Sequence, residues 1–336
     1  MTFKILSCDG GGIRGLITAL LIQDLDRRSR IIASADGFAG TSTGGLIALG
    51  LARGVSISEI VDIYRTKGPV IFRENGAWLA QKQALEQHPQ ALEQGTVLAG
   101  PGVFQCQYVN TGLQEIAKSL VGNGKLADLS RFVAINSARL WDPPTKSWAP
   151  CTFSNGNGNA YRNVSLFDAA LATSAAPTYF PPYEIAGLGY FADGGVFANN
   201  PSVSAIAEAL ASRRAGSLDD VRLLSLGTGT SPVGIAPDAV GNPLTWGVSK
   251  WLWPLESGRV PAAALLGLTM DTTAAIAAQQ AGQILNAHYQ RGNFVLGQSI
   301  ALDDWHKVPE LEKETQAYMR TAEWQRVCQW VEQFWR

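Results

Sequence analysis

Residues 40–44 read Gly40-Thr41-Ser42-Thr43-Gly44, a Gly-x-Ser-x-Gly pattern. Residues 31–40 before it are predicted to form a strand and turn, and the small residues 43–53 after it a short helix. A serine at such a strained turn stands at a helix N-terminus, where the helix dipole favours developing negative charge. The flanking glycines avoid steric clashes in the turn. The pattern therefore predicts a nucleophile, Ser42, and its simpler interpretation is a helix N-cap.

The same order of elements occurs elsewhere in the chain. Residues 3–8 are predicted to form a buried strand, 9–12 a glycine loop and 16–27 a helix, and further buried strands are predicted over 131–137 and 221–226. Alternation of short strands with helices is typical of βαβ units, which build a mostly parallel sheet. The predicted fold class is therefore α/β.

The loop after the first strand matches a second pattern, Gly10-Gly11-Gly12-Ile13-Arg14-Gly15. As a dinucleotide site it needs an acidic residue about 20 residues further on, and Asp36 lies near there. Alternatively, backbone N–H groups at a helix N-terminus can bind an oxyanion. Because the second strand leads straight into Ser42, an acyl-transfer site is favoured. Arg14 is expected to hold the loop or to bind a substrate phosphate.

A serine nucleophile needs a base. Asp193-Gly194-Gly195 follows the predicted strand end Gly189-Tyr190-Phe191-Ala192, where an acidic side chain can face a cleft. Asp-Gly is also one of the commonest turn pairs, so this segment alone favours an ordinary turn.

Taken together, the ordered segments 9–15, 40–44 and 193–195 resemble the patatin-like phospholipase family. Further similar stretches are 172–182, 195–201 and 224–229, and the resemblance extends from the N-terminus to about residue 230. In the tail, 289–291 and 302–304 also resemble bacterial members. Each motif alone is weak, whereas the ordered set of three is highly specific.

The resemblance implies a three-layer fold, with a mostly parallel sheet between helices and a helical C-terminal elaboration. It implies hydrolysis of fatty acyl esters in phospholipids, galactolipids or related lipids at a membrane surface, without a cofactor or a metal ion. The acyl-serine would form through a dyad of Ser42 and Asp193, with the amides of Gly10, Gly11 and Gly12 as the oxyanion hole. The residues that complete the motifs are Asp9, Arg14, Gly15, Gly40, Gly44, Gly194 and Gly195.

A catalytic triad is the main alternative, because Ser42, Asp193 and His306 have the chain order of α/β-hydrolases. His306 lies in a polar stretch that is typical of a surface turn, and the other histidines are His88 and His288. That fold also places several strands before its serine, whereas here one complete strand precedes the strand that carries the turn. The dyad is therefore favoured.

Composition excludes several classes of protein. Hydrophobic residues make up 46% and charged residues 16% of the chain, which indicates a folded protein, and the net charge of −1 does not favour a nucleic-acid partner. The four cysteines are scattered, so neither a zinc site nor a disulfide framework is predicted. The sequence shows neither a signal peptide nor about 20 consecutive apolar residues, and it predicts a cytoplasmic protein.

We expect a single domain, with a catalytic core over 1–230 and a mainly helical part over 231–336. Residues 66–105 have weak periodicity and are expected to form either a lid or a surface insertion. The C-terminal segment places Trp324, Val327, Cys328, Val331, Phe334 and Trp335 on one helical face. This face is expected to dock on the core, and the alternative is an interfacial or homodimer-forming helix.

Overall fold

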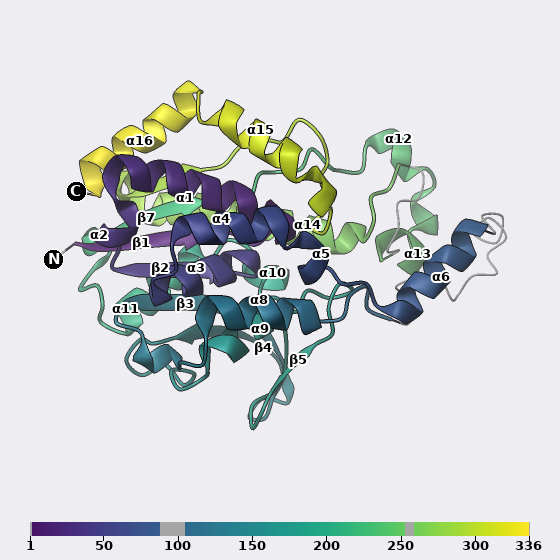
Figure 1. Cartoon of the computed structure of the whole chain (residues 1–336), viewed down its shortest axis with the longest axis horizontal. Helices are drawn as coiled ribbons and strands as arrows, with labels where there is room; N and C mark the ends of the chain where they lie inside the picture. The colour runs from purple at the N-terminus through teal and green to yellow at the C-terminus, as the bar shows by residue number, and fades with distance from the viewer. Residues whose placement is uncertain (1, 88–104, 253–258, 336) are drawn as a thin grey trace.

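Eight strands form one sheet within residues 2–87, 105–252 and 259–335, which the computed structural model describes (Figure 1). The strands are β1 (Phe3–Cys8), β2 (Gly37–Thr41), β3 (Phe132–Asp142), β4 (Ser147–Ser154), β5 (Tyr183–Ile185), β6 (Gly189–Asp193), β7 (Val221–Leu226) and β8 (Tyr289–Gly292). Their order is β5-β6-β3-β2-β1-β7-β8, and β4 pairs with β3. The pairs β3–β2, β2–β1, β1–β7 and β7–β8 are parallel, and those of β4, β5 and β6 are antiparallel. The predicted mostly parallel sheet is confirmed.

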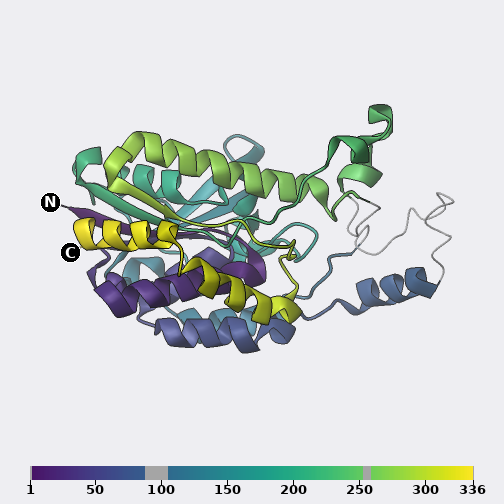
Figure 2. The same cartoon turned by 90° about the horizontal axis from the view of Figure 1, so that it is seen from above.

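Helices cover both faces of this sheet, as Figure 2 shows. On one face lie α10 (Gly195–Ala198), α11 (Ser202–Ala211) and α14 (Ala264–Leu285). On the other face α1 (Gly15–Ser29), α3 (Thr43–Arg53) and α9 (Leu166–Thr173) contact the strands, and over them pack α4 (Ile57–Thr66), α8 (Thr111–Val121), α15 (Val308–Tyr318) and α16 (Ala322–Phe334). The arrangement is the predicted three-layer fold.

The alternation of side chains along β1 explains why both faces are apolar. Phe3 and Ile5 pack in the core beneath α11 and α14, whereas Leu6 and Cys8 pack in the core beneath α1 and α3. Successive strand residues point to opposite faces of a sheet, and a parallel strand covered on both sides is therefore apolar almost throughout.

One predicted strand begins later than expected, and one strand was not predicted. Residues 31–34 form a short helix, α2 (Ile31–Ser34), and the second strand begins at Gly37. Arg30 has a left-handed backbone, with φ 48°, and turns the chain between α1 and α2. A short apolar run such as 31–33 does not distinguish helix from strand. In the tail, β8 was not predicted, because Tyr289–Gly292 lacks apolar alternation and forms a strand by pairing with β7.

The C-terminal helix docks on the core, as expected. In α16, Trp324, Val327 and Val331 are fully buried, and Trp335 just beyond it is 1% exposed. The Trp335 indole donates a hydrogen bond to the Ile31 carbonyl. The alternative of an interfacial or homodimer-forming face is wrong for these side chains, because the chain itself covers them.

The insertion at 66–105 is described in part. Its helices are α5 (Gly68–Ile71) and α6 (Gly76–Gln87), and residues 88–104 lie outside the described residues. Phe72 and Trp78 are buried against Tyr108, so the segment is anchored at its base. Figure 2 shows α6 projecting from the body, beyond the carboxyl ends of the parallel strands. A lid remains a prediction.

The region 231–336 also contains α12 (Pro237–Val240) and α13 (Val248–Trp251), which lie at the same end of the molecule as α6 (Figure 1). Within residues 2–87, 105–252 and 259–335, no helix combines the length and hydropathy that crossing a membrane requires.

Candidate active site

The register of the sheet brings Ser42 and Asp193 together. Thr41 of β2 pairs with Asn136 of β3, and the next residue of β3, Ser137, pairs with Asp193 of β6. Ser42 follows β2 and Asp193 ends β6, so the two side chains meet across β3. The glycine loop leaves the carboxyl end of β1 at the same edge. Open α/β sheets bind their ligands at this edge.

Ser42 occupies the strained turn that its motif predicts. Its backbone has φ 54° and ψ −124°, which a non-glycine residue adopts when the surroundings hold it there. A Cβ on Gly40 would lie 2.1 Å from the Gly44 carbonyl oxygen, and a Cβ on Gly44 would lie 2.1 Å from the Cys8 carbonyl oxygen. Both positions therefore exclude any side chain, so that the chain can pass from β2 into α3.

Thr173, at the end of α9, stabilises the Ser42 turn through its side-chain hydroxyl. Its hydroxyl accepts a hydrogen bond from the Ser42 amide at 2.8 Å and donates one to the Asn136 carbonyl at 2.5 Å. Thr173 is fully buried, so both bonds are protected from water. The hydroxyl thus ties the nucleophile to β3. Sequence reasoning placed Thr173 in a stretch of family resemblance without assigning it a role.

We expect Thr173→Val to lower kcat about 10- to 100-fold, because it leaves the buried Ser42 amide without an acceptor at a cost of about 1–3 kcal/mol. Thr173→Ser keeps the hydroxyl and serves as the matched control. Ester hydrolysis and thermal unfolding of both variants provide the measurement. Equal kcat in Thr173→Val and wild type would show that the hydrogen bond does not position Ser42.

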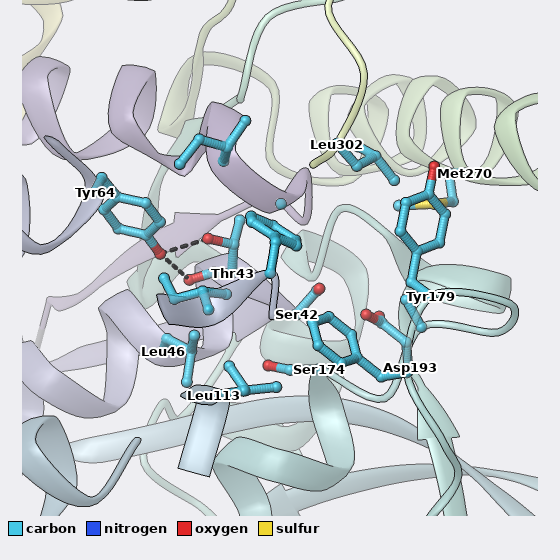
Figure 3. A pocket seen from close by; sticks show the side chains of 16 residues that line it. Ser42, Thr43, Leu46, Tyr64, Leu113, Ser174, Tyr179, Asp193, Met270 and Leu302 are labelled. Atoms are coloured by element: carbon cyan, nitrogen blue, oxygen red, sulfur yellow. Dashed lines mark hydrogen bonds between the residues drawn. The ribbon is translucent and has the colours of Figure 1, made fainter. Parts of the chain in front are cut away.

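The carboxyl group of Asp193 is arranged to accept a proton. Asp193 is 2% exposed, and its Oδ1 accepts a hydrogen bond from the Gly195 amide at 2.7 Å. Its Oδ2 has no hydrogen-bond partner among the described residues. Figure 3 shows the carboxylate and the Ser42 hydroxyl turned toward each other across the pocket. Catalytic hydrogen bonds are often long before substrate binds.

Burial raises the pKa of the Asp193 carboxyl to about 7, and contacts with the Ser42 hydroxyl and the Gly195 amide lower it in part. An ordinary aspartate has a pKa near 4 and is a weak base. A pKa near the working pH is what a general base needs. The surroundings of Asp193 therefore give it that property.

The glycine loop lies beside Ser42, but its amides are not equivalent. The Gly10 amide donates to the Asn199 carbonyl at 2.9 Å, so the prediction that it binds the oxyanion is wrong. In the described residues, the amides of Gly11 and Gly12 have no such acceptor. Gly12 has φ +58°, and a Cβ there would lie 2.1 Å from the Leu302 carbonyl oxygen. The loop can thus offer two amides to an oxyanion.

Side chains from distant segments hold the glycine loop in place. The Gly10 carbonyl accepts hydrogen bonds from the Thr228 hydroxyl at 2.9 Å and the Asn199 side-chain amide at 3.4 Å. The Asp9 carboxylate, 3% exposed, forms an ion pair with Arg291 of β8. These partners were not predicted as site residues. The stretches 195–201, 224–229 and 289–291, which contain them, nevertheless carried the resemblance.

The other motif residues have structural contacts. Arg14 is buried and donates to the Ser231 hydroxyl at 2.7 Å, so it anchors the loop, the first of its two predicted roles. Its side chain lines a neighbouring cavity together with Asp271. A Cβ on Gly15 would lie 2.4 Å from the Thr43 hydroxyl, and one on Gly194 would lie 2.4 Å from the Asn136 carbonyl oxygen.

Ser42 and Asp193 line a pocket whose walls are almost entirely apolar. Figure 3 shows Leu46, Tyr64 and Leu113 on one side of Ser42, with Tyr179 and Met270 on the other. Further lining residues are Ile71, Phe72, Phe180 and Leu302. The buried Ser174 hydroxyl also faces the pocket and has no hydrogen-bond partner among the described residues. Such a pocket suits a hydrocarbon chain next to one reactive ester.

Neither alternative site is formed. His306 is exposed in a short turn, where it stacks on Trp305, and it is not among the residues that line the Ser42 pocket. His288 contacts Phe334, and His88 lies outside the described residues. Asp36 precedes β2 and accepts a hydrogen bond from the Lys4 amide. It therefore lies at the amino edge of the sheet, opposite the glycine loop, and cannot complete a dinucleotide site there.

The amino-acid sequence is similar to those of known proteins. A model of the family described as patatin-like phospholipase matches residues 6–206. The chain is 32% identical over 255 residues to a cGAMP-activated phospholipase of Vibrio cholerae, covering 70% of this chain and 67% of that protein. A protein of the same description from Escherichia coli is 30% identical over 274 residues, covering 74% and 70%. Patatin-like protein 2 of Arabidopsis thaliana is 32% identical over 287 residues, covering 74% and 65%. The chain therefore belongs to the patatin-like phospholipase family of lipid acyl hydrolases.

Proposed function

We propose that the chain cleaves fatty acyl esters of membrane lipids through a dyad of Ser42 and Asp193. The observation that supports this most directly is the Asp193 carboxylate, which faces the Ser42 hydroxyl in an apolar pocket and whose Oδ2 has no hydrogen-bond partner among the described residues. A serine hydroxyl is a weak nucleophile until a base takes its proton. Asp193 supplies that base without a histidine.

In the acylation step, the Ser42 oxygen attacks the ester carbonyl carbon while Asp193 accepts the hydroxyl proton. The amides of Gly11 and Gly12 stabilise the tetrahedral oxyanion, and one such donor is typically worth about 3 kcal/mol in the transition state. The bond to the alcohol oxygen then breaks, and Asp193 returns the proton to that oxygen. An acyl-serine remains and the lysolipid leaves.

Deacylation repeats the sequence with water. A water molecule attacks the acyl carbonyl while Asp193 accepts one of its protons. The bond between the acyl carbon and the Ser42 oxygen breaks, and the proton returns to Ser42. The fatty acid leaves, and the free enzyme is restored.

The pocket beside Ser42 is proposed to hold the acyl chain. Leu46 of α3 and Leu113 of α8 are buried on the side of Ser42 away from Asp193. They line the pocket together with Tyr64, whose hydroxyl is hydrogen-bonded to Thr43. These side chains therefore limit the length of chain that fits.

We expect Leu113→Phe to lower the preference for a ten-carbon over a four-carbon acyl ester about tenfold. The larger ring displaces about two methylene groups, each worth about 0.8 kcal/mol of burial. The measurement is kcat/KM for a series of p-nitrophenyl esters, with the volume-conserving Leu113→Met as control. An unchanged chain-length profile would place the acyl chain elsewhere.

A small-molecule activator is also proposed, because three of the similar bacterial proteins are described as cGAMP-activated. Hydrolysis should therefore be assayed with and without cGAMP. A rate that rises with cGAMP supports regulation of the same kind, and an identical rate at saturating cGAMP contradicts it.

The proposed function is tested by incubating the full chain with phosphatidylcholine, phosphatidylglycerol and a galactolipid, in both arms of the cGAMP assay. We expect free fatty acid and lysolipid in equal amounts from at least one lipid. If none is cleaved in either arm, lipid hydrolysis by this chain is contradicted.

A further inference from the structure

Large exposed apolar side chains gather at one end of the molecule, before and at the beginning of α14. This apolar rim comprises Val233, Leu244, Val248, Leu252, Leu265 and Leu268, whose exposed fractions range from 41% to 94%. Figures 1 and 2 place α12, α13 and the beginning of α14 at the end of the molecule where α6 projects. A concentration of exposed apolar side chains on a folded protein marks an interaction surface.

The direction of α14 places the rim at the catalytic end. The C-terminal end of α14 leads into β8, which starts beside Leu223 and runs parallel to β7. The end of α14 therefore lies at the amino edge of the sheet, and its beginning lies at the carboxyl edge, where Ser42 lies. Leu265 and Leu268 are at the catalytic edge, whereas Ile284 is about 24 Å further along the helix than Leu268.

A second cavity lies between the rim and the catalytic pocket. Val233 of the rim and Leu266, next to Leu265, are among its walls. Tyr179, Met270 and Leu302 line both this cavity and the pocket of Ser42. These three side chains lie between the two spaces, so a hydrocarbon chain that enters at the rim has to pass them to reach the nucleophile.

The sequence around the rim carries few charges. Over 232–271 its ionisable residues are Asp238, Lys250, Glu256, Arg259 and Asp271. Arg259 forms an ion pair with Asp238 at 2.5 Å, and Asp271 faces the buried Arg14. Attraction to anionic lipid depends on clusters of Lys and Arg, which this segment lacks. The rim therefore suits a surface of zero net charge.

Two tryptophans of the rim region suit the boundary between water and the hydrocarbon of a lipid surface. The rings of Trp246 and Trp251 pack edge to face with centroids 4.9 Å apart, and the Trp246 indole donates to the Val240 carbonyl at 2.8 Å. Paired in this way, they stiffen the segment that carries Leu244 and Val248. Indole rings favour the level of the lipid headgroups, between water and hydrocarbon.

We propose that the apolar rim docks on a zwitterionic lipid surface and passes an acyl chain through the adjoining cavity to Ser42. Transfer of the chain rests on the proposed function, whereas docking does not and can be measured without hydrolysis. Insertion of the side chains into the headgroup–hydrocarbon boundary supplies the affinity.

Docking is tested by flotation of the full chain with phosphatidylcholine vesicles. Leu244 is 94% and Val248 is 75% exposed, so Leu244→Ser with Val248→Ser leaves the folded core intact. We expect the double variant to bind at least about tenfold more weakly. Ile284→Ser, at the far end of α14, is the matched control and should bind like wild type. Binding should be equal at low and high salt.

Hydrolysis assays of the double variant distinguish a loss of docking from a loss of catalysis. The double variant should cleave a soluble four-carbon ester like wild type and should lose vesicle hydrolysis at least about tenfold. If wild type cleaves neither substrate, with or without cGAMP, but floats with vesicles, the proposed function fails and docking stands. Three results would overturn docking. Wild type does not float with phosphatidylcholine vesicles, or it binds only anionic vesicles. Alternatively, wild type forms a dimer in sedimentation that the double variant loses.

Discussion

Ser42→Ala is expected to abolish ester hydrolysis, with a loss of about 10⁴-fold or more in kcat. The hydroxyl is the atom that becomes acylated, and no other group takes its place in the strained turn after β2. The loss of one oxygen from a side chain that is 8% exposed should leave thermal unfolding nearly unchanged. The measurement is p-nitrophenol release from medium-chain esters, with circular dichroism as the check of folding.

Ser174→Ala is the matched control for this experiment. Ser174 is buried in the same pocket, but its hydroxyl has no hydrogen-bond partner among the described residues and therefore no base. We expect this variant to retain activity within about tenfold of wild type, since it removes a hydroxyl without a hydrogen-bond partner among the described residues and not the nucleophile. If Ser174→Ala were inactive and Ser42→Ala active, the nucleophile would be misassigned.

Asp193→Asn is expected to lower kcat/KM about 10³-fold, because the amide cannot accept the Ser42 proton. The wild-type kcat/KM should rise with pH and level off above about 7, the pKa to which burial raises the Asp193 carboxyl. The residual activity of the variant should lack this rise. The measurement is a pH–rate profile from pH 5 to 9 for both proteins, and a profile shared by both would exclude Asp193 as the base.

The same substitution should stabilise the protein at high pH. The folded pKa of Asp193, about 7, lies above the unfolded value near 4, so the folded state binds a proton more tightly than the unfolded state. This contribution to stability is complete below pH 4 and is lost as pH rises through 7. At pH 8, Asp193→Asn should raise the free energy of unfolding by up to about 4 kcal/mol.

Denaturant unfolding at pH 8 and pH 5 measures this effect. The advantage of the variant over wild type should shrink at pH 5, where the wild-type carboxyl is protonated in the folded protein. If the Asp193→Asn protein were less stable than wild type at pH 8, burial of the ionised carboxylate would not destabilise the folded protein. The activity loss and the stability gain are thus independent signs of one buried base.

The elements that position the nucleophile could be predicted from the sequence, because their signals are local. The strand over 221–226 and the helix over 43–53 match β7 and α3 residue for residue. The glycines around Ser42 reflect steric constraints within a few residues of chain. Local patterns therefore predicted the fold class, the turn and the glycine loop.

The remaining parts of the site depend on contacts between distant segments. Thr173 reaches Ser42 from a helix 131 residues away, and Arg291 pairs with Asp9 across 282 residues. The Gly10 amide is occupied because Asn199, which follows α10, approaches it, and no pattern within the loop indicates this contact. Likewise, β8 is a strand because β7 lies beside it. Such interactions need the three-dimensional arrangement.

Trapping of the covalent intermediate tests the central claim most directly. The full chain is treated with an alkyl fluorophosphonate, which reacts with activated serines, and the labelled peptide is identified by mass spectrometry. A single adduct on Ser42, absent from Ser42→Ala and slowed in Asp193→Asn, is the predicted result. An adduct on another serine, or equal labelling of Ser42→Ala, would contradict the assignment of Ser42 as the nucleophile.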